Sequence, residues 1–323
     1  METPNSKIVL PDLPPHSQLP LVSIVVPTYN REELLCNTLR SLFTQTYPHL
    51  EIIVVDQTEE HEEFTRQFLE QNGYRLHIIH SRPPGVARAR SAGALAAHGD
   101  IVLYVDDDVV CDPGLVVGHV RAHQISGVGV VGGRITEDRD IEVDDDRVCR
   151  LYPDGTVTRF VTSRKRQFVD HAPGANMSFK RDLLLRAGLF EPLMGRTARF
   201  EETDACIRVV RLGYKVVFEP TARVHHLGGP GGQSYGVGFE GWYRTVVHNG
   251  LLLVWRNMRY RYWPLALLYR FRNAFYLTRR DHHLLPLRIF FEEAPRSLLS
   301  YFRSQNTLPK GAPRWPVKGM TNT

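Results

Sequence analysis

Cysteine is scarce in this sequence, and no cysteine pattern that would hold a small fold together is present. The four cysteines lie far apart, with no C-x-x-C pair, which argues against a zinc site and against a disulfide framework. We expect buried thiols in a reducing compartment. They are Cys36, Cys111, Cys149 and Cys206.

Long hydrophobic runs are also lacking. No apolar segment reaches the ~20 residues that a helix needs to span a bilayer. Residues 1–20 are polar and rich in proline, so we expect a flexible tail rather than a secretory signal peptide. The expected location is cytoplasmic, with contact to the cytosolic face of a membrane left open.

Two glycine-rich phosphate-binding motifs are missing. A dinucleotide-binding domain would place G-x-G-x-x-G after its first strand, where the backbone must approach a pyrophosphate. Here Pro27, Thr28, Tyr29 and Asn30 follow that strand, and no glycine is among them. The Walker A motif is absent as well. Nicotinamide enzymes and P-loop enzymes are therefore disfavoured.

What the sequence does contain is an ordinary globular composition with a small positive charge. Of its 323 residues, 42% are hydrophobic and 23% are charged, and the net charge is +5. A chain of this length can bury a full α/β core and carry a smaller module. The basic balance favours anionic partners such as nucleotides or phospholipid without choosing among them.

Apolar runs typical of buried strands alternate with helical periodicity through the first part of the chain. This alternation indicates βαβ units and predicts an α/β fold, with a doubly wound, mostly parallel sheet flanked by helices. The strands are expected at 21–26, 51–56, 76–79 and 101–105, and the helices at 34–43, 62–70 and 86–97.

The strand at 101–105 is the most informative segment, because Asp106, Asp107 and Asp108 follow it directly. Open α/β sheets bind ligands at the carboxyl ends of their strands. Carboxylate oxygens there suit Mg²⁺ or Mn²⁺ that also holds a substrate phosphate. A solvated turn is the plainer alternative. Residues 144–146 form a second Asp triplet without an apolar run before it, and we expect a solvated acidic loop there.

A series of short blocks resembles the inverting glycosyltransferases of family 2, which have the GT-A fold. The resemblance covers about residues 21–226. It implies an enzyme that moves a sugar from a nucleotide-diphosphate donor to an acceptor hydroxyl by one in-line displacement. The blocks lie at residues 22–31, 54–56, 85–90, 105–108, 174–180, 200–204, 213–220 and 225–226.

The resemblance assigns the nucleotide site to the ends of the first two strands and the helix at 86–97. Pro27, Thr28 and Tyr29 would frame the base, and Asp56 would accept a hydrogen bond from its ring N–H. From the residues alone, a helix- or turn-capping role for Asp56 is an equal alternative. Arg90 would lie near the phosphates, since arginine pairs well with phosphate oxygens.

The same resemblance places a divalent cation, Mn²⁺ or Mg²⁺, at the acidic triplet, which is similar to the D-x-D signature of the family. Asp108 would be the direct metal ligand. Asp106 would lie near the ribose and the waters of the metal, with Asp107 also on the nucleotide side, and His226 would be a further ligand. A cation bridging the diphosphate would neutralise charge as the leaving group departs.

Residues 201–204 carry three acids before a helix expected at 205–212. Acids at a helix N-terminus are stabilised by the helix dipole, which is the plain interpretation. In the resembling family an acid pair stands here, and its second member takes the proton of the acceptor hydroxyl. Glu202 is therefore the expected general base and Glu201 the fallback, while Asp204 caps and buttresses the helix.

The C-terminal part has a different composition. We divide the chain into a tail at 1–20, a nucleotide-sugar-binding catalytic domain at 21–230, and a C-terminal region at 231–323. A glycine run at the last boundary is interpreted either as a lid over the donor or as a linker. The helices after it mix leucine, aromatic residues and arginine, which suits a membrane surface or an ordinary helical subdomain on the acceptor side. Nucleic acid is not an expected partner.

The sequence leaves the substrates open. A UDP-sugar is the expected donor, although thymidine and guanosine donors use the same scaffold in the resembling family. The acceptor hydroxyl belongs to an unknown glycan, lipid-linked or small molecule. Two other functions stay as alternatives. A catalytically silent binding module would keep the fold but lose the metal or base residues, and a metal-dependent phosphoryl-transfer enzyme would release phosphate or pyrophosphate.

Overall fold

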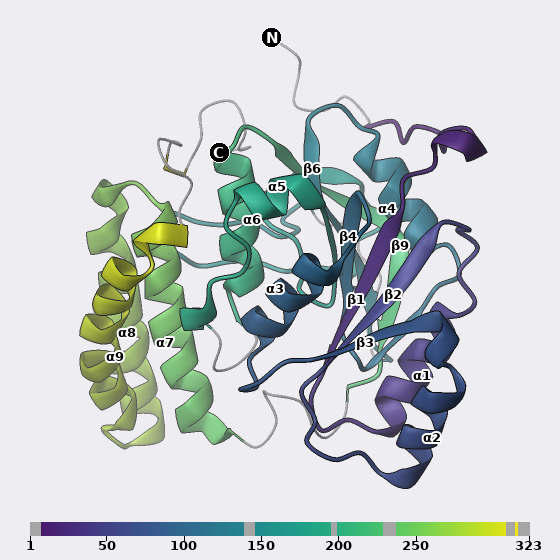
Figure 1. The fold of residues 1–323 in the computed structure, drawn as a ribbon. Helices are drawn as coiled ribbons and strands as arrows, with labels where there is room; N and C mark the ends of the chain where they lie inside the picture. Colours follow the sequence, from purple (N-terminus) through teal and green to yellow (C-terminus); the bar gives the residue numbers. More distant parts are fainter. Residues whose placement is uncertain (1–7, 139–145, 195–198, 229–236, 308–313, 316–323) are drawn as a thin grey trace.

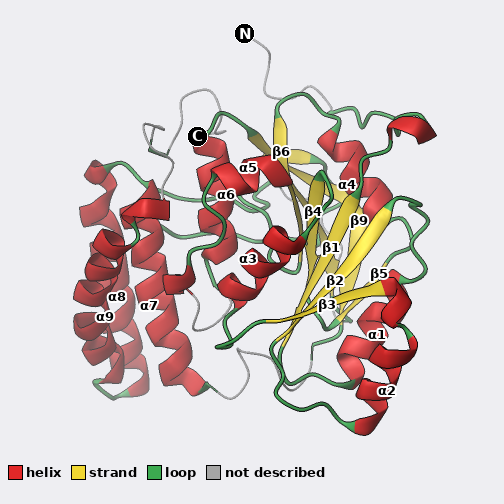
Figure 2. Ribbon diagram, viewed as in Figure 1, coloured by secondary structure: helices red, strands yellow, loops and turns green. Residues whose placement is uncertain are grey.

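A mixed β-sheet organises most of the protein (Figure 2). In this computed structural model the described residues are 8–138, 146–194, 199–228, 237–307 and 314–315. The nine-stranded sheet has the order β3-β2-β1-β4-β8-β6-β9-β5, and β7 pairs with β9. The strands are β1 (Val22–Thr28), β2 (Leu50–Asp56), β3 (Leu76–His80), β4 (Ile101–Val105), β5 (Val109–Cys111), β6 (Val128–Thr136), β7 (Gln167–Val169), β8 (Asn176–Lys180) and β9 (Lys215–His226).

The half of the sheet formed by β3, β2, β1 and β4 is parallel. Beyond it, β8 is antiparallel to β4 and β6, β9 is parallel to β6, and β5 and β7 are antiparallel to β9. Strands β1, β2, β3, β4, β6 and β9 therefore share one direction. The predicted α/β fold class is confirmed, while the mixed second half of the sheet was not predicted.

Both faces of β1, β2 and β4 are buried, which explains why these three strands are continuous apolar runs rather than alternating ones. Val25 points into one hydrophobic cluster and its neighbour Ile24 into another on the opposite face. Helix α3 (Val86–Ala96) covers the first face and α1 (Glu33–Leu42) the second. A Cβ on Gly93 of α3 would collide with the side chain of Val25, so glycine lets this helix lie close to the sheet.

The helices predicted at 34–43, 62–70 and 86–97 correspond to α1, α2 and α3. The helix predicted at 205–212 begins earlier, so that the acid pair lies inside its first turn. The remaining helices are α2 (Glu63–Gln71), α4 (Leu115–His123), α5 (Arg181–Arg186), α6 (Glu201–Arg211), α7 (Gly238–Asn257), α8 (Trp263–Asp281) and α9 (Leu285–Arg303).

Helices α7, α8 and α9 form a layer beside the sheet domain (Figure 1). Helix α7 packs against α6, and α8 and α9 pack on α7. One hydrophobic cluster joins these helices to Phe200 and Ile207 at α6, so the C-terminal helices are packed onto the sheet domain. Among the described residues, no helix combines the length and apolarity that crossing a membrane requires.

The proline-rich tail is packed where the structure describes it. Arg121 of α4 donates from Nε to the Pro11 carbonyl at 2.7 Å, and the Tyr47 hydroxyl donates to the Pro20 carbonyl at 2.6 Å. Residues 8–20 therefore differ from the freely flexible tail that the composition predicted, because their carbonyl groups find partners on the folded domain.

Two predicted segments fall partly or wholly outside the described residues. Of the glycine run at 228–232 only Gly228 is described, so the role of this run as a lid or linker stays a prediction. Residues 144 and 145 of the second Asp triplet are also not described. The third member, Asp146, is exposed and forms an ion pair with Lys165.

Candidate active site

The predicted nucleotide segments meet at one edge of the sheet. Because β1, β2 and β4 are parallel neighbours, their carboxyl ends lie together. Thr28 is paired with Asp56 across β1 and β2, and Asp106 follows the end of β4. Thr28 is buried, and Pro27 and Tyr29 beside it are half-buried. The sheet topology thus brings the expected base-binding residues next to the acidic triplet.

The Asp56 carboxylate already has several protein partners. Its Oδ1 accepts a hydrogen bond from the Thr58 N–H at 2.8 Å, and His61 Nε2 lies 3.1 Å from Oδ2. The other ring nitrogen of His61 lies 3.1 Å from Glu32. Although burial opposes it, hydrogen bonds from His61 and Thr58 hold the pKa of Asp56 below its usual value. The contact with the Thr58 N–H is the turn-capping role that was the alternative for Asp56 from the sequence alone. A nucleotide base at this site would share the Asp56 carboxylate oxygens with Thr58 and His61.

A possible metal-binding cluster forms where β5 pairs with β9. Val109 lies opposite His226 in this pairing, which places His226 Nε2 3.4 Å from Asp108 Oδ2. One ligand atom each from Asp106, Asp108 and His226 lie within 4.8 Å of one another. Within the described part of the chain, the buried Oδ1 of Asp108 has no hydrogen-bond partner. Two carboxylates, an imidazole and an open oxygen suit a divalent cation such as Mn²⁺ or Mg²⁺.

The pKa values of the three carboxyl groups of the triplet are shifted in different directions. Despite its burial, the hydrogen bond and charge of His226 and the charge of Arg31 keep the pKa of Asp108 below its usual value. Burial raises the pKa of Asp107 to about 7 and also raises that of Asp106. Asp108 is thus the member of the triplet whose pKa is lowered, which suits its predicted role as the direct metal ligand.

Arg31 is a site residue to which the sequence assigned no role. Its Nη1 forms ion pairs with Asp108 and, at 3.1 Å, with Asp107. The one sequence feature that could have identified Arg31 is its position as the last residue of the block at 22–31, which contains the first strand. Arg31 places a fixed positive charge on one side of the triplet.

Arg90 is buried and joins the triplet to the acid pair of α6. Its Nη1 donates to Glu201 Oε1 at 2.6 Å, and its Nη2 donates to Asp106 Oδ1 at 3.2 Å and to the Gly174 carbonyl at 3.0 Å. The resemblance placed Arg90 near the donor phosphates. Since carboxylates hold both ends of the guanidinium, a phosphate would share Arg90 with Asp106.

Glu201 and Glu202 begin α6 and are both buried. Burial and the neighbouring charge of Glu202 raise the pKa of Glu201 to about 8. At Glu202 burial is outweighed by Arg159, Arg90 and His171, which lower the pKa. Arg159 Nη2, which the sequence did not single out, lies 3.7 Å from Glu202 Oε1. Within the pair, Glu202 is therefore the acid whose pKa is lowered and Glu201 the one whose pKa is raised.

Asp204 lies one residue beyond the pair and has a different environment. Its oxygens accept hydrogen bonds from Arg208 Nε at 2.9 Å, Arg256 Nε at 2.9 Å and Asn257 Nδ2 at 2.6 Å. Despite burial, these partners lower the pKa of Asp204 to about 2. The N-cap of α6 is Phe200, with no side-chain capping bond. Asp204 therefore buttresses α6 against the end of α7 and does not cap the helix.

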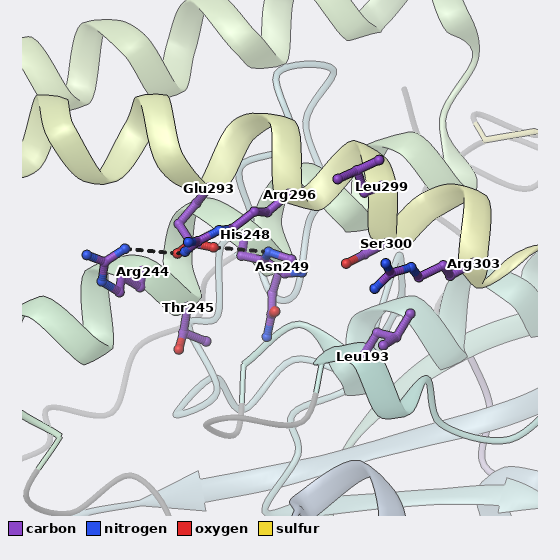
Figure 3. Close-up of a pocket in the computed structure, with 10 residues that line it drawn as sticks. All are labelled: Leu193, Arg244, Thr245, His248, Asn249, Glu293, Arg296, Leu299, Ser300 and Arg303. Carbon is purple, nitrogen blue, oxygen red and sulfur yellow. Dashed lines mark hydrogen bonds and ion pairs between the residues drawn. The ribbon is translucent and has the colours of Figure 1, made fainter.

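A cavity of about 370 Å³ lies apart from this edge, between α7 and α9 (Figure 3). Arg244 Nη1 lies 3.0 Å from Glu293 Oε1, and His248 Nδ1 lies 3.2 Å from Glu293 Oε2. Arg296 also pairs with Glu293 at 3.0 Å. These charges largely satisfy one another, and the cavity is lined by none of the predicted site residues, so we do not assign the reaction to it.

Comparisons of the sequence agree with this geometry. The sequence profile of glycosyl transferase family 2 matches residues 23–185. The glucosyl-dolichyl phosphate glucuronosyltransferase of Haloferax volcanii is 32% identical over 223 residues, which cover 64% of this chain and 68% of that protein. The probable glycosyltransferase YdaM of Bacillus subtilis is 25% identical over 221 residues, covering 64% of this chain and 50% of that protein.

Two solved structures share the fold. GalNAc-T7 with UDP, GalNAc and Mn²⁺ superimposes with a TM-score of 0.63 at 17% identity, covering 88% of this chain and 58% of that one. The mannosyltransferase PcManGT of Pyrobaculum calidifontis, with GDP-Man and Mn²⁺, gives a TM-score of 0.53 at 17% identity, with 91% and 90% covered. The chain therefore belongs to glycosyl transferase family 2 and is a glycosyltransferase with the GT-A fold.

Proposed function

We propose that this glycosyltransferase moves a sugar from a nucleoside-diphosphate donor to an acceptor hydroxyl in a single displacement, with inversion at the anomeric carbon. The Arg90 bridge is the observation that carries the proposal. One guanidinium contacts both Glu201, beside the proposed base, and Asp106 of the triplet. This contact would hold the proposed donor-phosphate site and the proposed base in a fixed relative position, as a direct displacement requires.

Asp106, Asp108 and His226 would hold Mn²⁺ or Mg²⁺, and the bound cation would neutralise charge on the departing diphosphate. The unpartnered Asp108 Oδ1 supports this assignment. Arg31 and Arg90 lie on two sides of the triplet, where they favour an anionic donor. Pro27, Thr28, Tyr29 and Asp56 are proposed to frame the nucleotide base.

Glu202 would accept the proton of the acceptor hydroxyl as the hydroxyl oxygen attacks the anomeric carbon. The new C–O bond forms while the bond to the diphosphate breaks, and the diphosphate leaves with the electron pair. The lowered pKa of Glu202 supports this role because it keeps the carboxylate ionised at neutral pH. Its buried Oε2 also lacks a hydrogen-bond partner within the described residues. Glu201 would orient Arg90.

The substrates are proposed by class. A UDP-sugar is the first donor to test, followed by GDP- and dTDP-sugars, since the two solved neighbours contain UDP and GDP-Man. A lipid-linked sugar is the first acceptor to test, because the Haloferax volcanii relative is named as an enzyme acting on glucosyl-dolichyl phosphate. Since nucleotide sugars are mostly cytosolic, we place the reaction in the cytosol or at the cytosolic face of a membrane.

Calorimetric titration of UDP, GDP and dTDP, each with Mn²⁺ and with a chelator, tests the donor site. We expect one nucleotide to bind in a metal-dependent way. Asp108→Ala should abolish the metal-dependent part, whereas Asp146→Ala, in the exposed acidic loop, should retain it. Equal affinity in wild-type protein and Asp108→Ala would remove Asp108 from the metal site.

Product analysis separates the proposal from its alternatives. With donor and acceptor, the expected products are a nucleoside diphosphate and a glycoside of inverted anomeric configuration. Release of free phosphate or pyrophosphate would instead indicate phosphoryl transfer. Nucleotide binding without turnover on any sugar acceptor would indicate a catalytically silent module.

A further inference from the structure

Helix α8 has its large apolar side chains on the outside. Its buried positions are Ala266, Arg270, Ala274 and Leu277, so two alanines, an arginine and a single leucine face inward. The buried Arg270 guanidinium lies 5.7 Å from the centre of the Phe200 ring. A helix that faces water normally has the opposite arrangement, with its apolar stripe toward the core. The exposed side chains are Leu265, Leu267, Leu268, Phe271, Phe275 and Tyr276.

The apolar surface continues from α8 onto α9. The Phe271 ring lies 6.5 Å from Phe275 on the same helix and 6.3 Å from Phe291 on α9, between ring centres. Phe291 is 64% exposed. We define Leu268, Phe271, Phe275, Tyr276 and Phe291 as the α8–α9 patch. These two helices lie on the side of α7 away from the sheet (Figure 1), so the patch belongs to the outer face of the C-terminal layer.

Arginines lie among the aromatic side chains of the patch. A groove of about 290 Å³ is lined by Phe271, Arg272, Phe275, Tyr276 and Arg279. Arg272 and Arg279 are exposed, and the Arg279 guanidinium lies 5.1 Å from the centre of the Phe275 ring. All five lining residues are described, and none of them is acidic. The groove therefore combines aromatic side chains with two cationic groups in its lining.

An adjacent groove on the same helix extends this surface. It is lined by Leu265, Leu268, Tyr269, Arg272, Asn273, Tyr276 and Asp154. Asp154 is the one acid of its lining. At the end of α8, the charge of Asp281 is paired with Arg280 at 2.6 Å. Among the described residues of the patch and its two grooves, Arg272 and Arg279 are positive and Asp154 is negative, so the net charge is positive.

From this surface we propose that the α8–α9 patch docks on an anionic lipid bilayer, with α8 lying in the plane of the headgroups. Helices with exposed aromatic and leucine residues beside arginine lie at such interfaces, with apolar side chains among the acyl chains and cations at the lipid phosphates. A second copy of the chain would instead bring the guanidinium groups of Arg272 and Arg279 toward their own equivalents. The proposal does not depend on the reaction proposed above, because binding to vesicles needs neither donor nor turnover.

Flotation of the full chain with lipid vesicles tests the proposal. We expect the protein to float with vesicles of phosphatidylcholine and phosphatidylglycerol, and much less with phosphatidylcholine alone. The double variant Phe275→Glu/Phe291→Glu should lower the partition coefficient by about 100-fold, since two aromatic contacts with lipid are lost. Arg272→Gln/Arg279→Gln should lower it by about 25-fold, and only on the anionic vesicles.

The matched control is Phe64→Glu/Tyr74→Glu, which adds the same charge at exposed aromatic residues on and beside α2. Phe64 is 45% exposed and Phe275 is 44% exposed, and α2 lies on the opposite side of the molecule from α8 (Figure 1). This control should float like the wild type. Thermal unfolding and nucleotide binding in solution show that each variant is folded.

Three outcomes would overturn the proposal. The first is equal flotation on neutral and anionic vesicles, and the second is equal loss in the α2 control. The third is a dimer in sedimentation without vesicles that the Phe275→Glu/Phe291→Glu variant abolishes, because the patch would then be the interface between two copies. If the wild-type protein floats with anionic vesicles but transfers no sugar, only the proposed function is contradicted, and the proposed membrane docking stands.

Discussion

The proposed catalytic edge of the sheet and the junction between α6 and α7 are built from the same kinds of residue and meet within one turn of α6. At the edge, Glu202 and Asp108 are buried, and each has an oxygen without a hydrogen-bond partner among the described residues. At the junction, Asp204 is equally buried, but Arg208, Arg256 and Asn257 use both of its oxygens.

This difference in pairing distinguishes acids proposed to act in the reaction from an acid that stabilises the fold. A buried charge is tolerated only where partners compensate for its desolvation. At Asp204 the compensation is internal, and the ion pairs hold α7 on α6. At Asp108 and Glu202 the compensation is incomplete, which leaves one oxygen for the proposed cation and one for the proton of the proposed acceptor hydroxyl. Changes on the two sides should therefore affect different measurements.

The largest effect is expected from Glu202→Gln. It removes the proposed base while keeping the shape of the side chain, so kcat should fall by about 10²–10⁴-fold. Thermal stability and nucleotide affinity should change little. Glu202→Asp, which restores the carboxylate, should recover part of the activity. Near-normal turnover of Glu202→Gln would move the base to Glu201 or elsewhere.

The next largest effect is expected from Asp204→Asn, in stability rather than chemistry. The variant leaves the buried guanidinium group of Arg208 without its carboxylate and leaves Arg256 with Glu191 as its carboxylate partner, which should cost about 3 kcal/mol of unfolding free energy. Denaturant unfolding measures this loss. The matched control is Asp182→Asn in α5, an exposed acid 3.9 Å from Arg186, which should cause no measurable change. Equal stability of the two variants would contradict the structural role of Asp204.

The same junction has an expected pH dependence. The pKa of Asp204 is lowered to about 2 in the folded protein, against about 3.9 for an unfolded Asp. Its stabilising contribution is therefore fully present above about pH 4 and is lost as the pH falls toward 2. Subtracting the acid-unfolding curve of Asp204→Asn from that of the wild type should isolate this slope. A difference that does not depend on pH over this interval would contradict the assignment.

The smallest effect is expected in the pH dependence of kcat, at the pH where activity falls on the acidic side. Arg159, Arg90 and His171 lower the pKa of Glu202, whereas burial and Glu202 raise that of Glu201 to about 8. A base must be deprotonated, so with Glu202 as base kcat should stay constant from pH 8 down to the ordinary range of a glutamate or below. An acid limb near pH 8 would indicate Glu201 instead.

Much of the fold could be predicted from the sequence, because its signals are local. The apolar runs ending in Asp56 and Asp106 identified β2 and β4, and parallel pairing alone brings their ends together. The pairing of β5 with β9, which places His226 beside Asp108, joins segments about a hundred residues apart and has no local signature. His226 was reached only through the resemblance.

The rest of the site depends on partners distant in sequence. Acids at the start of α6 suggested capping for Asp204, but its partners Arg256 and Asn257 come from the end of α7. The roles of Arg31 and Arg159 likewise arise from contacts with Asp107 and Glu202 across the fold. The mixture of leucine, aromatic residues and arginine in α8 was visible in the sequence, whereas which of them face outward was not.

Direct binding of Mn²⁺, followed by electron paramagnetic resonance in the presence of the nucleotide that binds, tests the central claim most directly. His226 and His225 are neighbours on β9, but only His226 contacts Asp108, while His225 lies 3.0 Å from Asp138. We predict that wild type and His225→Ala bind one Mn²⁺ per chain and that His226→Ala binds it far more weakly. Equal Mn²⁺ affinity in the two histidine variants would contradict a metal site at Asp106, Asp108 and His226.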